Sequence, residues 1–232
     1  MPLRRHLRPG HLEIGVDEAG RGCLAGPVTA AAVVLYPGHR SPRDLDDSKA
    51  TDAARREELR HWIEANALAW AVGWASPAEI DAENILQASM TAMHRAIDGC
   101  RQNLRDALCS DRAPLSAPGA LPAGFADRPH ALLIDGHYFR PYPGLEHSCQ
   151  VKGDARFQAI AAASVLAKTH RDERMRELHA RHPEYAWDSN KGYPTPPHRR
   201  ALAAHGVTEW HRRSFAPVRA RLRASGTEGP LL

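Results

Sequence analysis

Short apolar segments of strand length alternate, imperfectly, with longer amphipathic segments along this chain of 232 residues. The apolar segments are residues 12–16, 28–35, 68–75 and 131–134, and the second is bounded by Gly-Pro and Pro-Gly, which predicts a hairpin with the first. Apolar side chains at helical spacing indicate helices over residues 51–68, 84–104, 157–181, 196–205 and 217–223. The alternation predicts the α/β class, with a mixed sheet flanked by helices.

A single domain over residues 1–232 is expected, because 43% of the residues are hydrophobic and the length suits one sizeable core. We place the core at about 11–182 and a C-terminal helical extension at about 183–223. Residues 110–130 are rich in Pro, Ala and Gly and lack any period, which predicts an inserted, mobile surface loop.

Cellular location is predicted from two further features. The longest apolar run covers residues 28–36, well short of the roughly 20 residues that span a bilayer, so no membrane association is expected. The four cysteines show no CxxC spacing and are interpreted as free thiols in a reducing compartment. A cytoplasmic protein, monomeric in solution, fits this pattern.

The charge is concentrated near the C-terminus. The net charge is +4, and residues 199–223 hold seven arginines against one acid, Glu209. Such a stretch can follow the phosphates of a nucleic acid. A solvated arginine-rich surface explains the same stretch equally well.

Four acidic residues stand where chains of this class often place chemistry. Asp17 and Glu18 close the first strand before a glycine-rich turn, Asp135 closes the strand at 131–134, and Asp154 precedes a long helix. Acids at strand ends can converge at one edge of a sheet. Converged carboxylates suit hard divalent cations, and a pair of such ions supports phosphodiester hydrolysis. Two structural alternatives stay open: Asp154 as a helix cap, and Asp135 as a turn residue.

Motifs in a fixed order carry a resemblance that is more specific than these spacings. They are GVDEAGRGCLAGPV at 15–28, DDSK at 46–49, NILQASMTAM at 84–93, LIDG at 133–136, KGDARFQAIAAASVLAKTHRD at 152–172, KGYPTPPH at 191–198 and HRRSFAPV at 211–218. The set covers nearly the whole chain and resembles the ribonuclease HII family.

That resemblance implies a ribonuclease H-like fold with a mixed five-stranded sheet and a C-terminal helical extension. It implies that Asp17, Glu18, Asp135 and Asp154 are the catalytic acids and bind Mg²⁺ or Mn²⁺. Its substrate-binding residues correspond to Gly20, Arg21 and Gly22, with Tyr193 as the residue that recognises the RNA–DNA junction. The expected substrates are RNA–DNA hybrids and DNA duplexes that contain ribonucleotides, cut to leave 5′-phosphate and 3′-hydroxyl ends.

Further cations are candidates for phosphate contacts. Lys49 in the DDSK motif is one, and Lys168 and Arg171, one turn apart on the long helix, are predicted to face the nucleic acid, with Lys168 paired to Asp172. Two rival functions remain at this stage. One is the related ribonuclease HIII, and the other is a non-catalytic module that binds nucleic acid through the basic tail.

Overall fold

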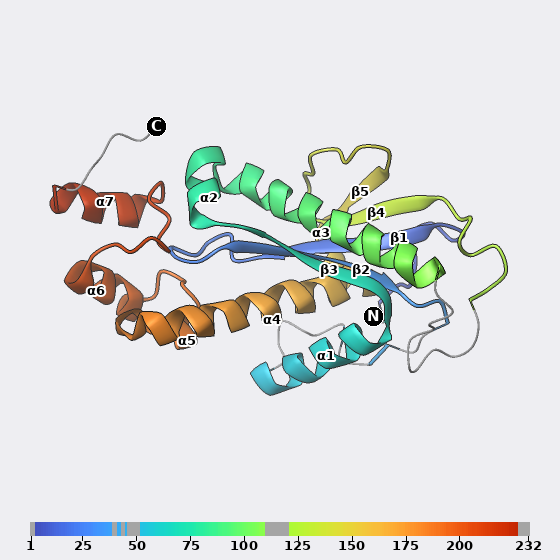
Figure 1. The fold of residues 1–232 in the computed structure, drawn as a ribbon, viewed down its shortest axis with the longest axis horizontal. Coiled ribbons are helices and arrows are strands. Elements are labelled where there is room, and N and C mark those ends of the chain that lie inside the picture. The colour runs from blue at the N-terminus through green and yellow to red at the C-terminus, as the bar shows by residue number, and fades with distance from the viewer. Residues whose placement is uncertain (1–2, 39–40, 43–44, 46–51, 110–120, 227–232) are drawn as a thin grey trace.

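The computed structural model describes residues 3–38, 41–42, 45, 52–109 and 121–226. Five strands form one sheet in the order β3-β2-β1-β4-β5 (Figure 1). The strands are β1 (Leu12–Ala19), β2 (Val28–Leu35), β3 (Ala67–Ala75), β4 (His130–Asp135) and β5 (Glu146–Gln150). β1, β2 and β3 pair antiparallel, whereas β4 is parallel to both β1 and β5. The predicted mixed sheet and its hairpin are therefore confirmed.

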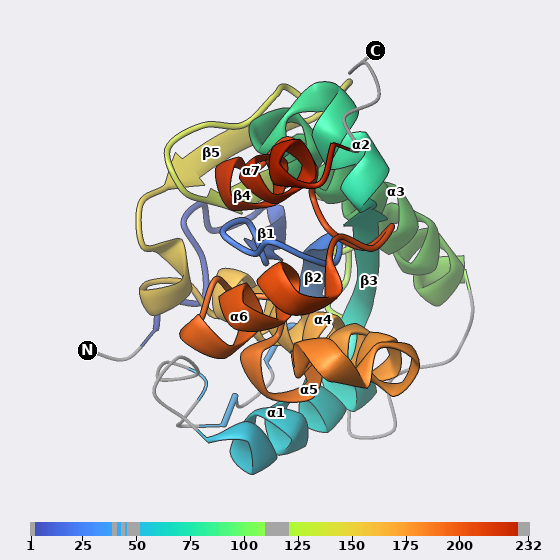
Figure 2. The ribbon, with the colours of Figure 1, turned by 90° about the vertical axis from the view of Figure 1, so that its left-hand side faces the viewer.

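Helices cover both faces of the sheet (Figures 1 and 2). On one face lies α3 (Ile85–Cys109), preceded by the short α2 (Pro77–Glu83), and on the other lie α1 (Ala53–Asn66) and α4 (Gln158–Arg181). The C-terminal extension follows, with η3 (Pro183–Tyr185), α5 (Trp187–Asn190), α6 (Pro196–His205) and α7 (Ala216–Ala224). Figure 2 shows this extension in front of one end of the sheet.

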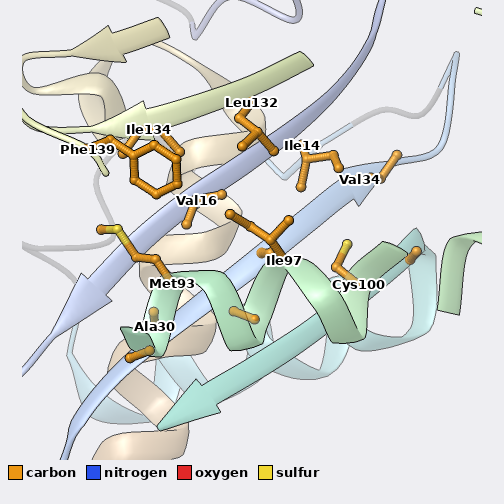
Figure 3. Packing of buried hydrophobic residues seen from close by; sticks show 14 of the residues in the cluster. Ile14, Val16, Ala30, Val34, Met93, Ile97, Cys100, Leu132, Ile134 and Phe139 are labelled. Atoms are coloured by element: carbon orange, nitrogen blue, oxygen red, sulfur yellow. The ribbon is translucent and has the colours of Figure 1, made fainter. Parts of the chain in front are cut away.

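Alternation along β1 assigns its two faces. Ile14 and Val16 point toward α3 and pack with Met93 and Ile97 in the larger hydrophobic core (Figure 3). Asp17 belongs to the opposite face, toward α4. A second core fills the space between that face and helices α1 and α4, and includes the alanines at 161–163. The central strand is thus buried on both sides, which fixes its register and the direction of every side chain that it carries.

Gly15 allows α4 to approach β1 unusually closely. A Cβ atom on Gly15 would lie 2.2 Å from the backbone carbonyl carbon of Ala159. Only glycine fits such a contact. The face of β1 that carries Asp17 therefore lies directly against α4.

Several elements differ from the sequence-based expectations, β5 and the short α5 among them. α2 was not predicted, although Ser76 and Glu79 form a reciprocal capping box at its start. The predicted loop at 110–130 divides in two: 110–120 lie outside the described residues, while Phe125 is 5% exposed in the larger core. Among the described helices, none is long and apolar enough to cross a membrane. All four cysteines are free, as predicted.

Candidate active site

The acids of β1 and β4 lie side by side because these two strands are parallel neighbours. Val16 pairs with Ile134, so the next residues along the two strands are Asp17 and Asp135. Both line one cavity at the end of the sheet from which the β1–β2 connection departs. Asp17 and Asp135 therefore converge at one edge of the sheet, as predicted, because the pairing of β1 with β4 places them side by side.

Asp17 is the most deeply buried of these acids and is 5% exposed. Burial raises its pKa well above the usual range, and repulsion from Glu18 and Asp135 adds to the rise. Two groups oppose the shift: the Ser164 side chain on α4, and the Glu18 amide, which donates to Asp17 Oδ1 at 2.7 Å. Sequence analysis missed Ser164 because it stands among alanines on a small-residue face, which indicates packing.

Glu18 forms an ion pair with Arg21 in the turn that follows β1. Arg21 Nη1 lies 3.1 Å from Glu18 Oε1, and the two side chains line the same cavity. Burial raises the pKa of Glu18, while Arg21 acts in the opposite direction. Arg21 is about half exposed, so its guanidinium can be reached by an incoming phosphate.

Asp135 is tied to the loop that carries Asp154. Its Oδ1 accepts a 2.7 Å hydrogen bond from the Gly153 amide, and Asp154 is the next residue, 8% exposed in η2 (Gly153–Ala155). Asp135 thus anchors a neighbouring segment, as its alternative interpretation anticipated in part. The capping alternative for Asp154 is wrong: Phe157 is the N-cap of α4, without a side-chain capping bond.

The cavity has a volume of about 540 Å³ and brings most of the predicted site residues together. It is lined by Asp17, Glu18, Ala19, Gly20, Arg21, Gly22, Arg56, Asp135, Ser164, Val165, Lys168 and Tyr193. Asp154 is not part of this lining. Lys49 lies outside the described residues. Lys168 forms the predicted pair with Asp172, at 2.5 Å, and still faces the cavity.

Arg171 contradicts its prediction, because it does not face solvent. It is 1% exposed and donates to the backbone carbonyls of Ala25, Pro27 and Lys191. A Cβ atom on Gly20, whose φ is +91°, would lie 1.9 Å from Arg171 Nε. The guanidinium therefore underlies the Gly20–Gly22 turn and supports its backbone. The helical spacing from Lys168 gave no indication of this role.

A second buried guanidinium supports the same turn from the C-terminal extension. Arg212 is 0% exposed and donates to the carbonyls of Arg21 and Gly26, at 2.9 and 3.0 Å. Burial lowers its pKa to about 10, so it remains cationic at neutral pH. Sequence analysis counted it among surface arginines, whereas it is a structural support of the site.

Tyr193 stands at the rim of the cavity and is 41% exposed. Its ring centroid lies 6.0 Å from the Arg171 guanidinium carbon. Burial of part of the ring raises the pKa of its hydroxyl, and the nearby Cys23 thiol adds to the rise. The ring is open to a ligand on one side and supported by a cation on the other.

The donor atoms fit a hard divalent cation. Within the described part of the chain, no three acidic, histidine or cysteine side chains enclose a metal position by themselves. Mg²⁺ typically takes one or two carboxylates and completes its shell with water and substrate phosphate. Asp17, Glu18 and Asp135 supply oxygen donors in a cavity, and their mutual repulsion, which raises the pKa of Asp17, is what a bound cation would relieve.

Comparison with solved structures identifies the fold. Ribonuclease H2 from Pyrococcus horikoshii OT3 superposes with a TM-score of 0.68 at 20% identity, covering 93% of this chain and 99% of that one. Bst-RNase HIII, solved in complex with Mn²⁺, gives 0.59 at 18% identity, covering 94% and 71%. The fold is ribonuclease H-like, as expected. These likenesses define the class of fold.

Comparison of sequences narrows this class to one family. The model of the Ribonuclease HII family matches residues 14–218. The ribonuclease HII of Parabacteroides distasonis is 48% identical over 213 residues, which cover 92% of this chain and 94% of the relative. The chain belongs to the ribonuclease HII family. This membership decides against ribonuclease HIII and against a non-catalytic binding module.

Proposed function

We propose that this enzyme hydrolyses the RNA strand of RNA–DNA hybrids and cuts on the 5′ side of ribonucleotides embedded in duplex DNA. The products carry 5′-phosphate and 3′-hydroxyl ends. The observation that carries the proposal is a single cavity that joins Asp17, Glu18 and Asp135 to the Gly20–Gly22 turn and to Tyr193. The three acids suit metal-dependent chemistry, and the turn together with Tyr193 suits recognition of a ribose at a junction.

Asp17, Glu18, Asp135 and Asp154 would hold Mg²⁺ or Mn²⁺, with the scissile phosphate as a further ligand. Such ions, when bound, activate a water for in-line attack and stabilise the leaving oxygen. The acids therefore act as ligands and not as nucleophiles. Ser164 lines the cavity beside Asp17 and lowers the pKa of that carboxyl group, which favours the ionised form that binds a cation.

The cations around the cavity would bind the substrate backbone. Arg21 and Lys168 both line the cavity, and each is held by an acid that a phosphate could replace as partner. Gly20 and Gly22 leave the backbone of the turn accessible to a ribose and its phosphate. A site that selects RNA must hydrogen-bond the 2′-hydroxyl, and amides of this turn together with Tyr193 are the groups we assign to that contact.

The proposal is tested with a duplex that carries one ribonucleotide, incubated with Mg²⁺, Mn²⁺ or EDTA. We expect metal-dependent cleavage on the 5′ side, with a 5′ end that phosphatase treatment changes and a 3′ end that a polymerase extends. Asp135→Asn should abolish cleavage and leave the fold intact. Asp127→Asn, at an exposed acid away from the cavity, is the matched control. Cleavage by Asp135→Asn at the parent rate would contradict the assignment of the acids.

A further inference from the structure

Two histidines are buried together behind Tyr193. His198 on α6 is 0% exposed, and His211, between α6 and α7, is 1% exposed. Their Nε2 atoms lie 3.3 Å apart, and the indole Nε1 of Trp187 lies 3.1 Å from His198 Nε2. On the far side of the ring, His198 Nδ1 lies 2.9 Å from the carbonyl oxygen of Tyr193. A continuous polar chain thus ends on the backbone of a cavity residue.

The partners of this chain determine which nitrogen carries each proton. The indole N–H of Trp187 can only donate, so His198 Nε2 must accept, and the proton of His198 stays on Nδ1, where it is donated to Tyr193. His211 Nδ1 accepts from the Thr208 amide at 3.1 Å, so His211 carries its proton on Nε2, which shares the one lone pair of His198 Nε2 with the Trp187 indole. Every ring nitrogen then has a partner only if both rings are neutral.

The surroundings favour the neutral forms. Burial lowers the pKa of His198, and burial together with the neighbouring His198 and His182 lowers the pKa of His211 to about 3. The other titratable rings packed around the pair are Tyr185, stacked on Trp187, and His205 at the edge of Tyr185. Hydrogen bonding to the Tyr193 and Gly192 backbone acts in the opposite direction on the pKa of His198, but burial outweighs it.

The backbone that receives this hydrogen bond is fixed at several points. The Tyr193 carbonyl also accepts from the Thr195 amide at 2.8 Å, and the Tyr193 amide donates to Asn190 at 2.9 Å. The preceding Gly192 carbonyl accepts from the Leu24 amide at 2.8 Å, which ties this turn to the β1–β2 connection. Tyr193 is therefore oriented by its backbone, while its ring stays 41% exposed at the cavity.

We propose that His198 and His211 are positioning residues for junction recognition, acting as a neutral hydrogen-bonded pair that fixes the Tyr193 backbone and so the direction of its ring. This inference rests on the proposed role of Tyr193. Neither histidine lines the cavity, so their effect reaches the substrate only through Tyr193. They affect the selection of single ribonucleotides more than hydrolysis itself, because Asp17, Glu18, Asp135 and Asp154 lie on β1, β4 and η2, outside the C-terminal extension.

Four variants test this pair. His198→Ala removes the donor to Tyr193, whereas His198→Asn can place an amide N–H where Nδ1 stood. His211→Gln retains a donor toward His198. His205→Ala, at an exposed histidine of the same helix, is the control. We expect His198→Ala to lower cleavage of a single-ribonucleotide duplex about tenfold, with cleavage of a continuous RNA strand reduced by less than about twofold. The tenfold loss on the single-ribonucleotide duplex corresponds to about 1.4 kcal/mol, the size of one hydrogen bond. Partial recovery is expected in His198→Asn and near-parent rates in His211→Gln and His205→Ala.

A double-mutant cycle separates positioning from a merely structural role. In a Tyr193→Ala background, His198→Ala should leave the ratio of rates on the two duplexes unchanged. A further tenfold change of that ratio in this background would overturn the proposal. If Tyr193→Ala alone leaves the ratio at the parent value, the assignment of Tyr193 fails instead, and the histidines are then judged by spectroscopy.

Nuclear magnetic resonance of the parent enzyme tests the charge and tautomer of His198 and His211 directly, and it does not depend on the folding of a variant. Side-chain ¹⁵N shifts should show a neutral His198 protonated on Nδ1 and a neutral His211 protonated on Nε2, unchanged from about pH 5.5 to 8.5. The Tyr193 ring signals should be equally constant over this range. Titration of either ring there, or the opposite tautomers, would contradict the pair as described.

Discussion

Gly15→Ala changes one hydrogen atom to a methyl group at the closest contact between β1 and α4. The new Cβ would lie 2.2 Å from the Ala159 carbonyl carbon, whereas ordinary contact begins at 3.4 Å, so α4 and β1 must separate by roughly 1 Å. Overpacking of a core typically costs about 1–3 kcal/mol, and a rigid backbone on both sides points to the upper value. For a chain of this length, about 3 kcal/mol corresponds to a fall in Tm of roughly 6–12 °C.

The same displacement should impair catalysis. Ser164 on α4 and Asp17 on β1 line the same cavity, and a misplacement of about 1 Å near a reacting group can cost on the order of 100-fold in rate. Thermal unfolding followed by circular dichroism, and metal-dependent cleavage below the melting temperature, measure the two effects. Gly22→Ala is the control for stability, because its Cβ would meet no atom within 4 Å. A Tm for Gly15→Ala within about 2 °C of the parent would refute the close-packing argument.

Three further predictions follow from the site and its surroundings. Asp17→Asn should raise the Tm in EDTA. The pKa of Asp17 is raised in the folded state, so its ionisation lowers the stability of the parent as the pH rises from about 3.8 through the folded pKa. The difference in Tm between variant and parent, measured between pH 4 and 8, should therefore grow with pH, and an equal Tm at every pH would contradict this. Tyr193→Phe should cut a single embedded ribonucleotide moderately less well and Tyr193→Ala far less well, at unchanged Tm and metal dependence; parent activity of Tyr193→Ala would make it only a loop anchor. Replacing residues 110–120 with a short Gly/Ser linker should leave the Tm nearly unchanged, because closure entropy varies slowly with loop length. Phe125→Ala, by contrast, should lower the free energy of chemical unfolding by about 3–5 kcal/mol, because Phe125 is buried in the larger core. A larger loss of stability from the linker than from Phe125→Ala would contradict this prediction.

The sequence predicts most of the fold because most of its elements carry a local pattern. Helix α6 was expected at 196–205 and is observed over the same residues. Strand β5, with the sequence EHSCQ, was missed, since it lacks alternation and branched residues. It is a strand because it pairs with the buried β4, which the local sequence of four polar residues and one cysteine does not indicate.

The candidate site was likewise predictable only in part. Asp17, Glu18 and Asp135 were predictable because acids at the ends of apolar strands are conspicuous, and Tyr193 came from the family resemblance. Ser164 and Arg171 were not recognised, since their roles depend on the rotation of α4 against β1 and the neighbouring turn. Spacing along a helix predicts which side chains share a face, and only packing decides what that face meets.

The hydrogen bonds that join the 24–26 segment to the C-terminal extension suggest how the molecule could be re-engineered. Leu24, Gly26 and Arg212 bond across this boundary through their amides, whereas Asp17 and Asp135 stand at the ends of β1 and β4. The extension brings Tyr193 to the cavity, and the sheet brings these carboxylates to it. A library confined to side chains of the extension around Tyr193 would leave the carboxylates unchanged, and selection on duplexes with ribonucleotides in different contexts would reveal whether selectivity varies independently of cleavage.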